Sequence, residues 1–231
     1  MGFLTFSIDH TFLGLRNTFR AVLLGVVVFH GGLASADNAN ALGDGPVVMV
    51  VGDSLSAAYG LSERDGWVNL AEEALSERWP GVQMVNASIS GDTTAGGMRR
   101  LPAALERFEP DLVIIELGGN DGLRAYPTDA MRDNLIGMAE AAQDSGATAL
   151  IFGMMIPSNY GPAYTESFSA AFGEAANATG ALLLPFFLEP IAMDRSYFQR
   201  DGIHPTAEAQ PLLLEHVLPL IEQALEQAKA L

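Results

Sequence analysis

The stretch PVVMVVGDSLS, residues 46–56, combines a short apolar run with a glycine turn and a serine. Residues 47–51 are continuously apolar, as expected for a strand of a parallel sheet that is covered on both faces. Gly52 permits a tight turn after this strand, and Ser54 follows the turn. The pattern places Ser54 at the carboxyl end of a buried strand, where ligands bind in open α/β sheets.

Apolar runs and amphipathic stretches alternate from here to the C-terminus. Further strands are predicted at residues 82–86, 112–117, 147–154 and 181–184. Helices are predicted at residues 66–78, 94–108, 128–145, 164–179 and from 206 onward. Asp65, Thr128 and Thr206 are candidate N-caps, and Gly180 is a candidate C-cap. Five such alternations predict an α/β fold in which a parallel sheet carries helices on both sides.

Two glycine-containing segments are predicted to lie beside Ser54. Gly91 follows the second predicted strand, and Asn120 follows the third. The N–H groups of Ser54 and Gly91 and the amide of Asn120 are suitable donors for an oxyanion. Each has a simpler alternative, since the serine suits a helix N-cap and the other two suit turns. Their convergence on one edge of the sheet favours an oxyanion hole made by Ser54, Gly91 and Asn120.

The histidines narrow the choice of a general base. His204 lies in the segment Asp201-Gly202-Ile203-His204-Pro205, whereas His216 lies in a predicted helix. An aspartate three residues before a histidine can accept a hydrogen bond from Nδ1 and leave Nε2 to take a proton. We therefore predict a catalytic triad of Ser54, His204 and Asp201, with Asp53 and Asp121 holding loops through backbone N–H groups.

The first 36 residues have the features of an export signal. Arg16 and Arg20 precede an apolar run at residues 21–29, and Ala34-Ser35-Ala36 fits signal peptidase cleavage before Asp37. The alternative, a membrane anchor, requires about 18 to 20 continuous apolar residues, and this run is shorter. We expect a signal peptide at residues 1–36, a short segment at 37–45 and a hydrolase domain at 46–231, in a protein that is periplasmic or secreted.

Charge and cysteine content exclude several classes of partner. Cleavage would leave 27 acidic and 10 basic side chains, a net charge of −17, and this charge repels nucleic acid. The chain has no cysteine and therefore no disulfide or thiolate metal site. No phosphate-binding loop, dinucleotide fingerprint or zinc protease motif occurs, so no cofactor and no metal are expected. Arg99, Arg100 and Arg124 follow the two glycine-containing segments and would offset the negative charge locally. We expect a monomer without a stable membrane anchor.

The four segments resemble the SGNH (GDSL) hydrolase superfamily, with Ser54, Gly91, Asn120 and His204 in its four motifs. The sequence is most similar to the bacterial periplasmic group of acyl-CoA thioesterase I, protease I, lysophospholipase and arylesterase. The resemblance implies a three-layer α/β/α, flavodoxin-like fold with a five-stranded parallel sheet. It also implies hydrolysis of aryl esters, lysophospholipids and acyl thioesters through an acyl-enzyme on Ser54, without a cofactor. The alternatives are a carbohydrate acetylesterase of the same superfamily and a non-catalytic lipid-binding protein.

Overall fold

The computed structural model describes residues 44–230. The predicted signal peptide at residues 1–36 lies outside the described residues, as does most of the segment at 37–45. Five parallel strands form one sheet in the order β2-β1-β3-β4-β5. This is the flavodoxin-like order, and it confirms the predicted fold class. The strands are β1 (Val47–Gly52), β2 (Gln83–Asn86), β3 (Leu112–Glu116), β4 (Thr148–Phe152) and β5 (Leu182–Leu184).

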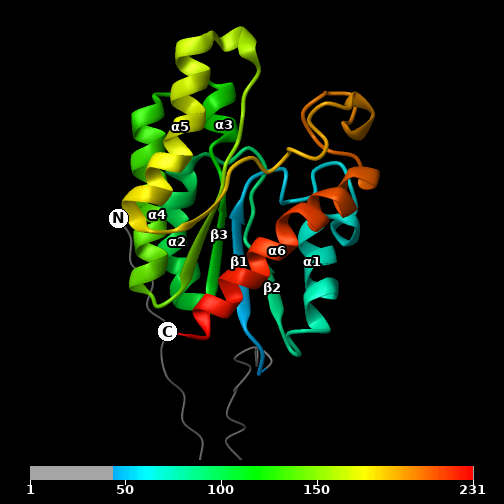
Figure 1. Cartoon of the computed structure of the whole chain (residues 1–231), viewed down its shortest axis with the longest axis vertical. Coiled ribbons are helices and arrows are strands. Elements are labelled where there is room, and N and C mark those ends of the chain that lie inside the picture. Colours follow the sequence, from blue (N-terminus) through cyan, green and yellow to red (C-terminus); the bar gives the residue numbers. More distant parts are fainter. Residues whose placement is uncertain (1–43, 231) are drawn as a thin grey trace, which may run out of the picture. The chain divides into compact units, whose positions relative to one another are not determined.

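Helices cover both faces of the sheet and complete the three layers (Figure 1). One face carries α2 (Thr94–Phe108), α4 (Thr128–Asp144) and α5 (Pro162–Thr179), and the other carries α1 (Trp67–Ser76) and α6 (Gln210–Ala228). A short helix, α3 (Gly119–Leu123), follows β3 directly. The 3-10 helices are η1 (Glu63–Asp65), η2 (Ser158–Tyr160), η3 (Arg195–Tyr197) and η4 (Ala207–Ala209). Among the helices described here, none is long and apolar enough to cross a membrane.

The central strands are apolar because both of their faces are buried. Every residue of β1, β3 and β4 is buried, which accounts for their unbroken apolar runs. On the α1 and α6 side of the sheet, Trp67, Phe152 and Phe187 pack together with ring centroids 5.3–5.7 Å apart. These contacts fix the strands whose carboxyl ends carry the functional loops.

The N-cap predictions for α1 and α4 are wrong. Asp65 lies in η1, and the backbone of Gly66 precedes α1 without a side-chain cap. The first N–H of α1, that of Trp67, instead donates to the side chain of Gln210 at 3.0 Å. Thr128 is the first residue of α4, which no side chain caps.

Of the other capping residues, Thr206 was predicted at a helix N-terminus and Gly180 at a helix C-terminus. Thr206 precedes η4 but makes no capping bond, whereas Thr93 caps α2 by accepting from the N–H of Gly96. Gly180 ends α5 with a φ of 72°, as predicted.

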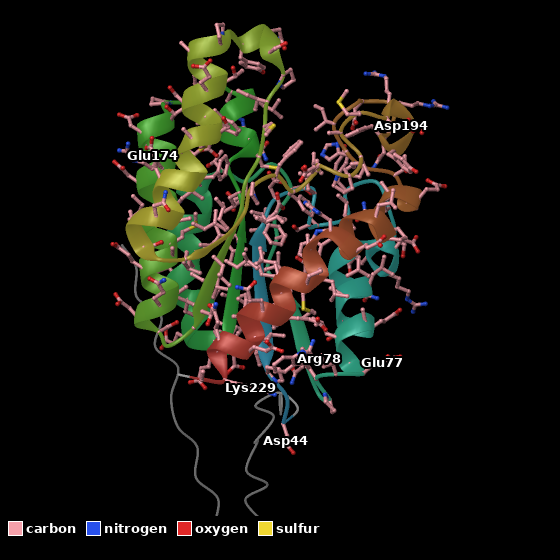
Figure 2. All side chains as sticks on the ribbon, viewed as in Figure 1. Asp44, Glu77, Arg78, Glu174, Asp194 and Lys229 are labelled. Atoms are coloured by element: carbon pink, nitrogen blue, oxygen red, sulfur yellow. The ribbon has the colours of Figure 1, made fainter. Side chains whose placement is uncertain are left out.

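At the end of the domain where β1 begins, Arg78 forms ion pairs with Glu222 and Glu226 of α6 (Figure 2).

The strand order creates the position of the site. The chain passes from β1 to β2 on one side and then crosses to β3 on the other side of β1. The loops after β1 and β3 therefore diverge at the carboxyl edge and leave a crevice, which is where such sheets bind ligands. Ser54 follows β1, and Asn120 lies in α3 after β3.

Candidate active site

Ser54, His204 and Asp201 form one continuous line of hydrogen bonds. Ser54 Oγ lies 2.9 Å from His204 Nε2, and His204 Nδ1 lies 2.7 Å from Asp201 Oδ2. With the Nδ1 proton directed at the carboxylate, Nε2 has a free lone pair toward the serine hydroxyl. The structure thus brings together three side chains that are separated by up to 150 residues in the sequence.

Asp201 also organises its own loop. Its Oδ1 accepts hydrogen bonds from the N–H groups of Ile203 and His204, at 2.9 and 3.1 Å. The hydrogen bond from His204, followed by that from the Ile203 N–H, lowers the pKa of Asp201 from 3.8 to about 2. The carboxylate is therefore ionised at any pH at which an ester hydrolase is assayed, and it can orient the imidazole and stabilise its charged form.

The loop that carries His204 is fastened to the first loop of the site. Phe198 and Pro205 form an isolated antiparallel bridge that closes the loop on itself. Gln199 joins the two loops, because its amide donates to the carbonyl oxygen of Tyr59 at 2.7 Å. The Tyr59 ring lies against the imidazole of His204 with centroids 4.3 Å apart. The histidine is therefore held on one side by a carboxylate and on the other by an aromatic ring.

The predicted oxyanion donors converge on the same crevice. Within residues 44–230, the N–H groups of Ser54 and Gly91 have no hydrogen-bond acceptor. Gly91 has a φ of 80°, in the region that favours glycine, and no atom crowds its Cβ position closer than 3.9 Å. Two unpaired backbone donors beside a serine hydroxyl are what a developing oxyanion requires.

Asn120 reaches the site through Asp53. Its Nδ2 donates to Asp53 Oδ2 at 2.9 Å, while Asp53 Oδ1 accepts from the N–H of Leu55 at 3.0 Å. The bond from Leu55 agrees with the predicted role of Asp53 in holding its loop, whereas the bond from Asn120 was not predicted. Burial raises the pKa of Asp53 from 3.8 to about 6, although the bonds from Leu55 and Asn120 oppose this shift.

A second carboxyl group, that of Glu116, lies buried beneath this turn. Glu116 is the last residue of β3, and its Oε2 accepts from the Ser56 hydroxyl at 2.6 Å and from the Asp53 N–H at 3.3 Å. Burial, and then the charge of Asp53, raise the pKa of Glu116 well above its usual 4.5. This shift favours the protonated, neutral form of the side chain. Glu116 was not predicted as a site residue from the sequence, although an acidic residue near the end of an apolar strand was a visible signal.

The crevice continues into a cavity of about 690 Å³, within the range of small-molecule sites. Asp53, Ser54, Gly91, Asn120 and His204 line one end. The remaining wall is largely apolar and includes Met154, Met155, Ile156, Pro157, Leu188 and Phe198. An extended apolar group attached to a reactive carbonyl fits this arrangement.

Other polar residues singled out in the sequence lie elsewhere. His216 Nε2 donates to the carbonyl oxygen of Phe186 at 3.0 Å, and the residue does not line the cavity. Asp121 accepts from the N–H and hydroxyl groups of Thr94, which ties α3 to the start of α2, as expected of a loop-holding aspartate. In the part of the chain that the structure describes, no group of three or more His, Cys, Asp or Glu side chains could hold a metal ion.

Comparison with known proteins places this geometry in a family. Residues 50–211 match the model of the GDSL-like Lipase/Acylhydrolase family. Esterase TesA of Pseudomonas aeruginosa is 48% identical over 178 residues, covering 77% of this chain and 89% of the relative. Thioesterase 1/protease 1/lysophospholipase L1 of Escherichia coli K12 is 39% identical over 169 residues, covering 73% and 79%.

A solved structure agrees with the sequence comparison. The psychrotrophic esterase EstA from Pseudoalteromonas sp., in a structure inhibited by monoethylphosphonate, is 40% identical to this chain with a TM-score of 0.75. The similarity covers 78% of this chain and 99% of that one. This chain therefore belongs to the GDSL-like lipase/acylhydrolase family, the SGNH hydrolases that its four segments resemble.

Proposed function

We propose that this protein hydrolyses carboxylic esters and thioesters through an acyl-enzyme on Ser54. The observation that carries the proposal is the hydrogen-bonded line from Asp201 through His204 to Ser54 at the mouth of an apolar cavity. Esterases, a thioesterase and a lysophospholipase are named among its relatives. Their names support the same substrate class for this chain.

The proposed reaction has two halves. Ser54 Oγ attacks the acyl carbonyl carbon while His204 Nε2 accepts the hydroxyl proton, and the carbonyl π electrons move onto oxygen. Collapse of this intermediate re-forms the carbonyl and breaks the bond to the alcohol or thiol, which takes the proton from His204. A water molecule then repeats the attack on the acyl-serine with His204 as base. It releases the carboxylic acid and restores Ser54.

Negative charge on the acyl oxygen is stabilised by three donors in this proposal. The free N–H groups of Ser54 and Gly91 supply two, and the second amide hydrogen of Asn120 supplies the third. Because Asp53 accepts one amide hydrogen of Asn120, the group is already oriented before substrate arrives. Such preorganised donors are worth about 10² to 10³ each in turnover.

The apolar lining of the cavity favours an ester with an extended apolar group over an acetylated sugar. Its walls beyond the reacting end are mostly Met, Ile, Pro, Leu and Phe side chains, whereas sugar hydroxyls require convergent polar partners. We therefore propose aryl esters, lysophospholipids and acyl thioesters as the substrate class. A carbohydrate acetylesterase or an inactive lipid-binding protein is the alternative outcome of the test.

The test combines covalent labelling with a substrate panel. Purified protein is treated with a fluorophosphonate probe, and turnover is measured with aryl esters, acyl-CoA, lysophospholipid and acetylated xylan fragments. Labelling should occur on Ser54 and vanish in Ser54→Ala, which should lose at least about 10⁴-fold in turnover. A folded Ser54→Ala protein with wild-type activity would contradict the mechanism, and activity confined to acetylated sugars would contradict the substrate class.

We further propose that the protein is exported and works outside the cytoplasm. The proposal of export rests on the positively charged, apolar and small-residue segments of residues 1–36. We propose separately that the protein works as a monomer. N-terminal sequencing of the protein recovered from the periplasm or medium should begin at Asp37. Recovery of the full-length chain in the cytoplasm would contradict this.

A further inference from the structure

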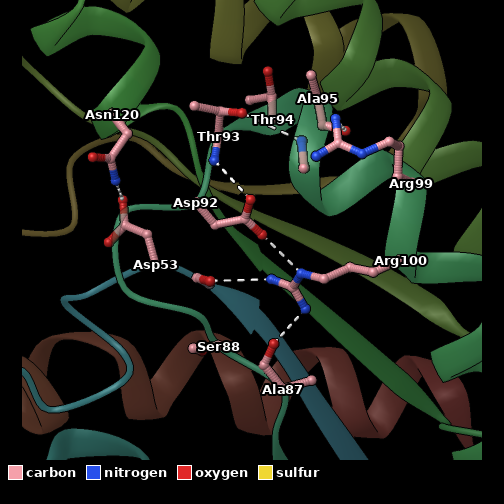
Figure 3. A network of polar contacts seen from close by, with 12 residues as sticks. Asp53, Ala87, Ser88, Asp92, Thr93, Thr94, Ala95, Arg99, Arg100 and Asn120 are labelled. Carbon is pink, nitrogen blue, oxygen red and sulfur yellow. Dashed lines mark hydrogen bonds and ion pairs between the residues drawn. The ribbon is translucent and has the colours of Figure 1, made fainter.

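The guanidinium group of Arg100 reaches from α2 to three acceptors, one at the end of β1 and two in the loop after β2 (Figure 3). Nε donates to Asp92 Oδ2 at 2.8 Å, Nη1 donates to the carbonyl oxygen of Ala87, and Nη2 donates to the carbonyl oxygen of Gly52 at 3.2 Å. The side chain is only 21% exposed, and that of Asp92 only 13%. A charged group so placed is held more firmly than a surface ion pair.

The three acceptors are distributed around the two backbone oxyanion donors. Gly52 lies two residues before Ser54, at the end of β1. Ala87 opens the loop after β2, and Asp92 directly follows Gly91 in that loop. One guanidinium group therefore closes the Gly91 loop at both of its ends and fastens it to the strand that leads to the nucleophile.

The backbone on either side of the clamp is already restrained. The Gly52 carbonyl oxygen also accepts the N–H of Ile89 at 3.0 Å, so both partners of Gly52 belong to the Gly91 side of the site. The N–H of the same peptide group, which belongs to Asp53, donates to the side chain of Glu116. The peptide that precedes Ser54 by one residue is thus held through its oxygen by Arg100 and through its nitrogen by Glu116.

The Asp92 carboxylate packs against Gly96 in the first turn of α2, where no larger residue would fit. A Cβ atom on Gly96 would lie 1.6 Å from Asp92 Oδ1, so a glycine is required where the carboxylate rests on the first turn of α2. Asp92 Oδ1 accepts from the N–H of Thr93 at 3.0 Å, which leaves Oδ2 for Arg100. One carboxylate oxygen therefore holds the end of the Gly91 loop, and the other holds Arg100.

We propose that Arg100 is a positioning residue that sets the distance between the oxyanion-donating N–H groups of Ser54 and Gly91. The inference rests on the proposed hydrolase function and adds to it a residue that does not touch the substrate. Oxyanion stabilisation depends steeply on donor placement, and an error of about 1 Å at a reacting centre costs on the order of 10² in rate. Loss of the clamp therefore acts on turnover more than on substrate binding.

The neighbouring Arg99 provides a matched control. It has the same charge and the same helix, but its guanidinium donates only to the Ala95 carbonyl oxygen of its own helix and is exposed. Lysine at position 100 keeps the charge but offers a single ammonium group in place of the planar fork, and it cannot join three acceptors in the same geometry. Arg100→Met removes both the charge and the hydrogen bonds at similar length.

The experiment measures kcat and KM for a neutral aryl ester in the wild type, Arg100→Met, Arg100→Lys and Arg99→Met. Active sites are counted by fluorophosphonate titration so that kcat refers to folded protein. We expect Arg100→Met to lose about 10- to 100-fold in kcat with KM changed less than about threefold. Arg100→Lys should show a smaller loss of the same kind, and guanidinium ion added to Arg100→Met should restore part of the turnover.

The outcomes separate this proposal from the proposed function. If Arg100→Met only reduces the number of titratable sites, or if either Arg100 variant turns over at the wild-type rate per site, the positioning role is wrong. A loss seen equally in Arg99→Met would also overturn it, because it would reflect charge rather than the clamp. Full activity in Ser54→Ala would instead refute the hydrolase mechanism itself.

Discussion

The Asp53 carboxylate and the Asn120 amide, 2.9 Å apart, connect the loop after β1 to α3, the short helix that follows β3, across the crevice of the sheet. Each residue follows a different strand, and the contact spans 67 positions of sequence. An amide that gives one hydrogen to Asp53 has its remaining hydrogen fixed in direction. The relationship converts a conformationally free asparagine into an oriented donor.

Asp53→Asn should lower kcat by about 10- to 100-fold with little change in KM. An asparagine has one side-chain oxygen, so it cannot accept from both Leu55 and Asn120, and its own NH₂ group would face the amide of Asn120. Steady-state kinetics on an aryl ester checks this. In a double-mutant cycle with Asn120→Ala, the second substitution should add little. Losses that multiply would show that the two residues act independently.

The acid side of the pH profile should contain the ionisation of Asp53. Asp53, whose pKa burial raises to about 6, is ionised above that pH and accepts both bonds, and it is protonated below it. The logarithm of kcat/KM should therefore fall more steeply with decreasing pH in the wild type than in Asp53→Asn. Identical slopes would show that Asp53 does not titrate in the active protein.

Glu116→Gln should be more stable than the wild type at pH 8 and no more stable at pH 4. The pKa of Glu116 is raised well above 4.5, chiefly by burial, so its stabilising contribution is present below the unfolded value and is lost as pH rises. Glutamine stays neutral and still accepts from Ser56. Urea unfolding at both pH values tests this, with the exposed Glu106→Gln as control. A stability difference that does not change with pH would mean that Glu116 is ionised in the folded state.

The two histidines of the described domain should respond differently to substitution. His204→Ala should lose about 10⁴-fold or more in turnover because it removes the base that contacts Ser54. His216→Ala should retain kcat and the pH profile, since His216 contacts the Phe186 carbonyl oxygen away from the triad. Rate measurements from pH 5 to 9 on both variants decide this, and equal losses would contradict a single base.

Salt should favour acyl-CoA relative to neutral esters. The whole chain carries a net charge of −16, so it repels a polyanionic substrate at long range, and dissolved ions screen this repulsion. Arg100 is committed to Asp92 and cannot receive a phosphate, while Arg124 donates to the Gly91 carbonyl oxygen at 3.1 Å. Specificity constants for palmitoyl-CoA below its micelle concentration should rise with ionic strength. A fall would require a basic site for the CoA phosphates.

Much of the fold could be predicted because its signals are local. Ser54 and Asn120 each follow a continuous apolar run, and His204 precedes the last predicted helix. Their shared edge could therefore be predicted from the alternation of strands and helices. The three-layer arrangement and the five-stranded sheet were predicted from the resemblance to SGNH hydrolases. Gly180 was predictable for the same reason, since glycine readily adopts the left-handed conformation that commonly ends a helix.

The errors arose where a distant residue decides a local feature. Asp65 does not cap α1 because Gln210, 143 residues away, supplies an acceptor for the Trp67 N–H. Arg100 could be read only as a basic residue near the site, because the acceptors that occupy its guanidinium lie on other loops. Such partners are set by tertiary packing, which local propensity does not encode.

The dependence of α1 on Gln210 has a consequence for synthesis. The base, the carboxylate that orients it and the acceptor for the first turn of α1 all lie within residues 201–210, close to the C-terminus. The triad and the first turn of α1 can therefore be completed together only after residues 201–210 have left the ribosome. A shorter nascent chain has no assembled active site, so ester hydrolysis can begin only after α6 has started to dock.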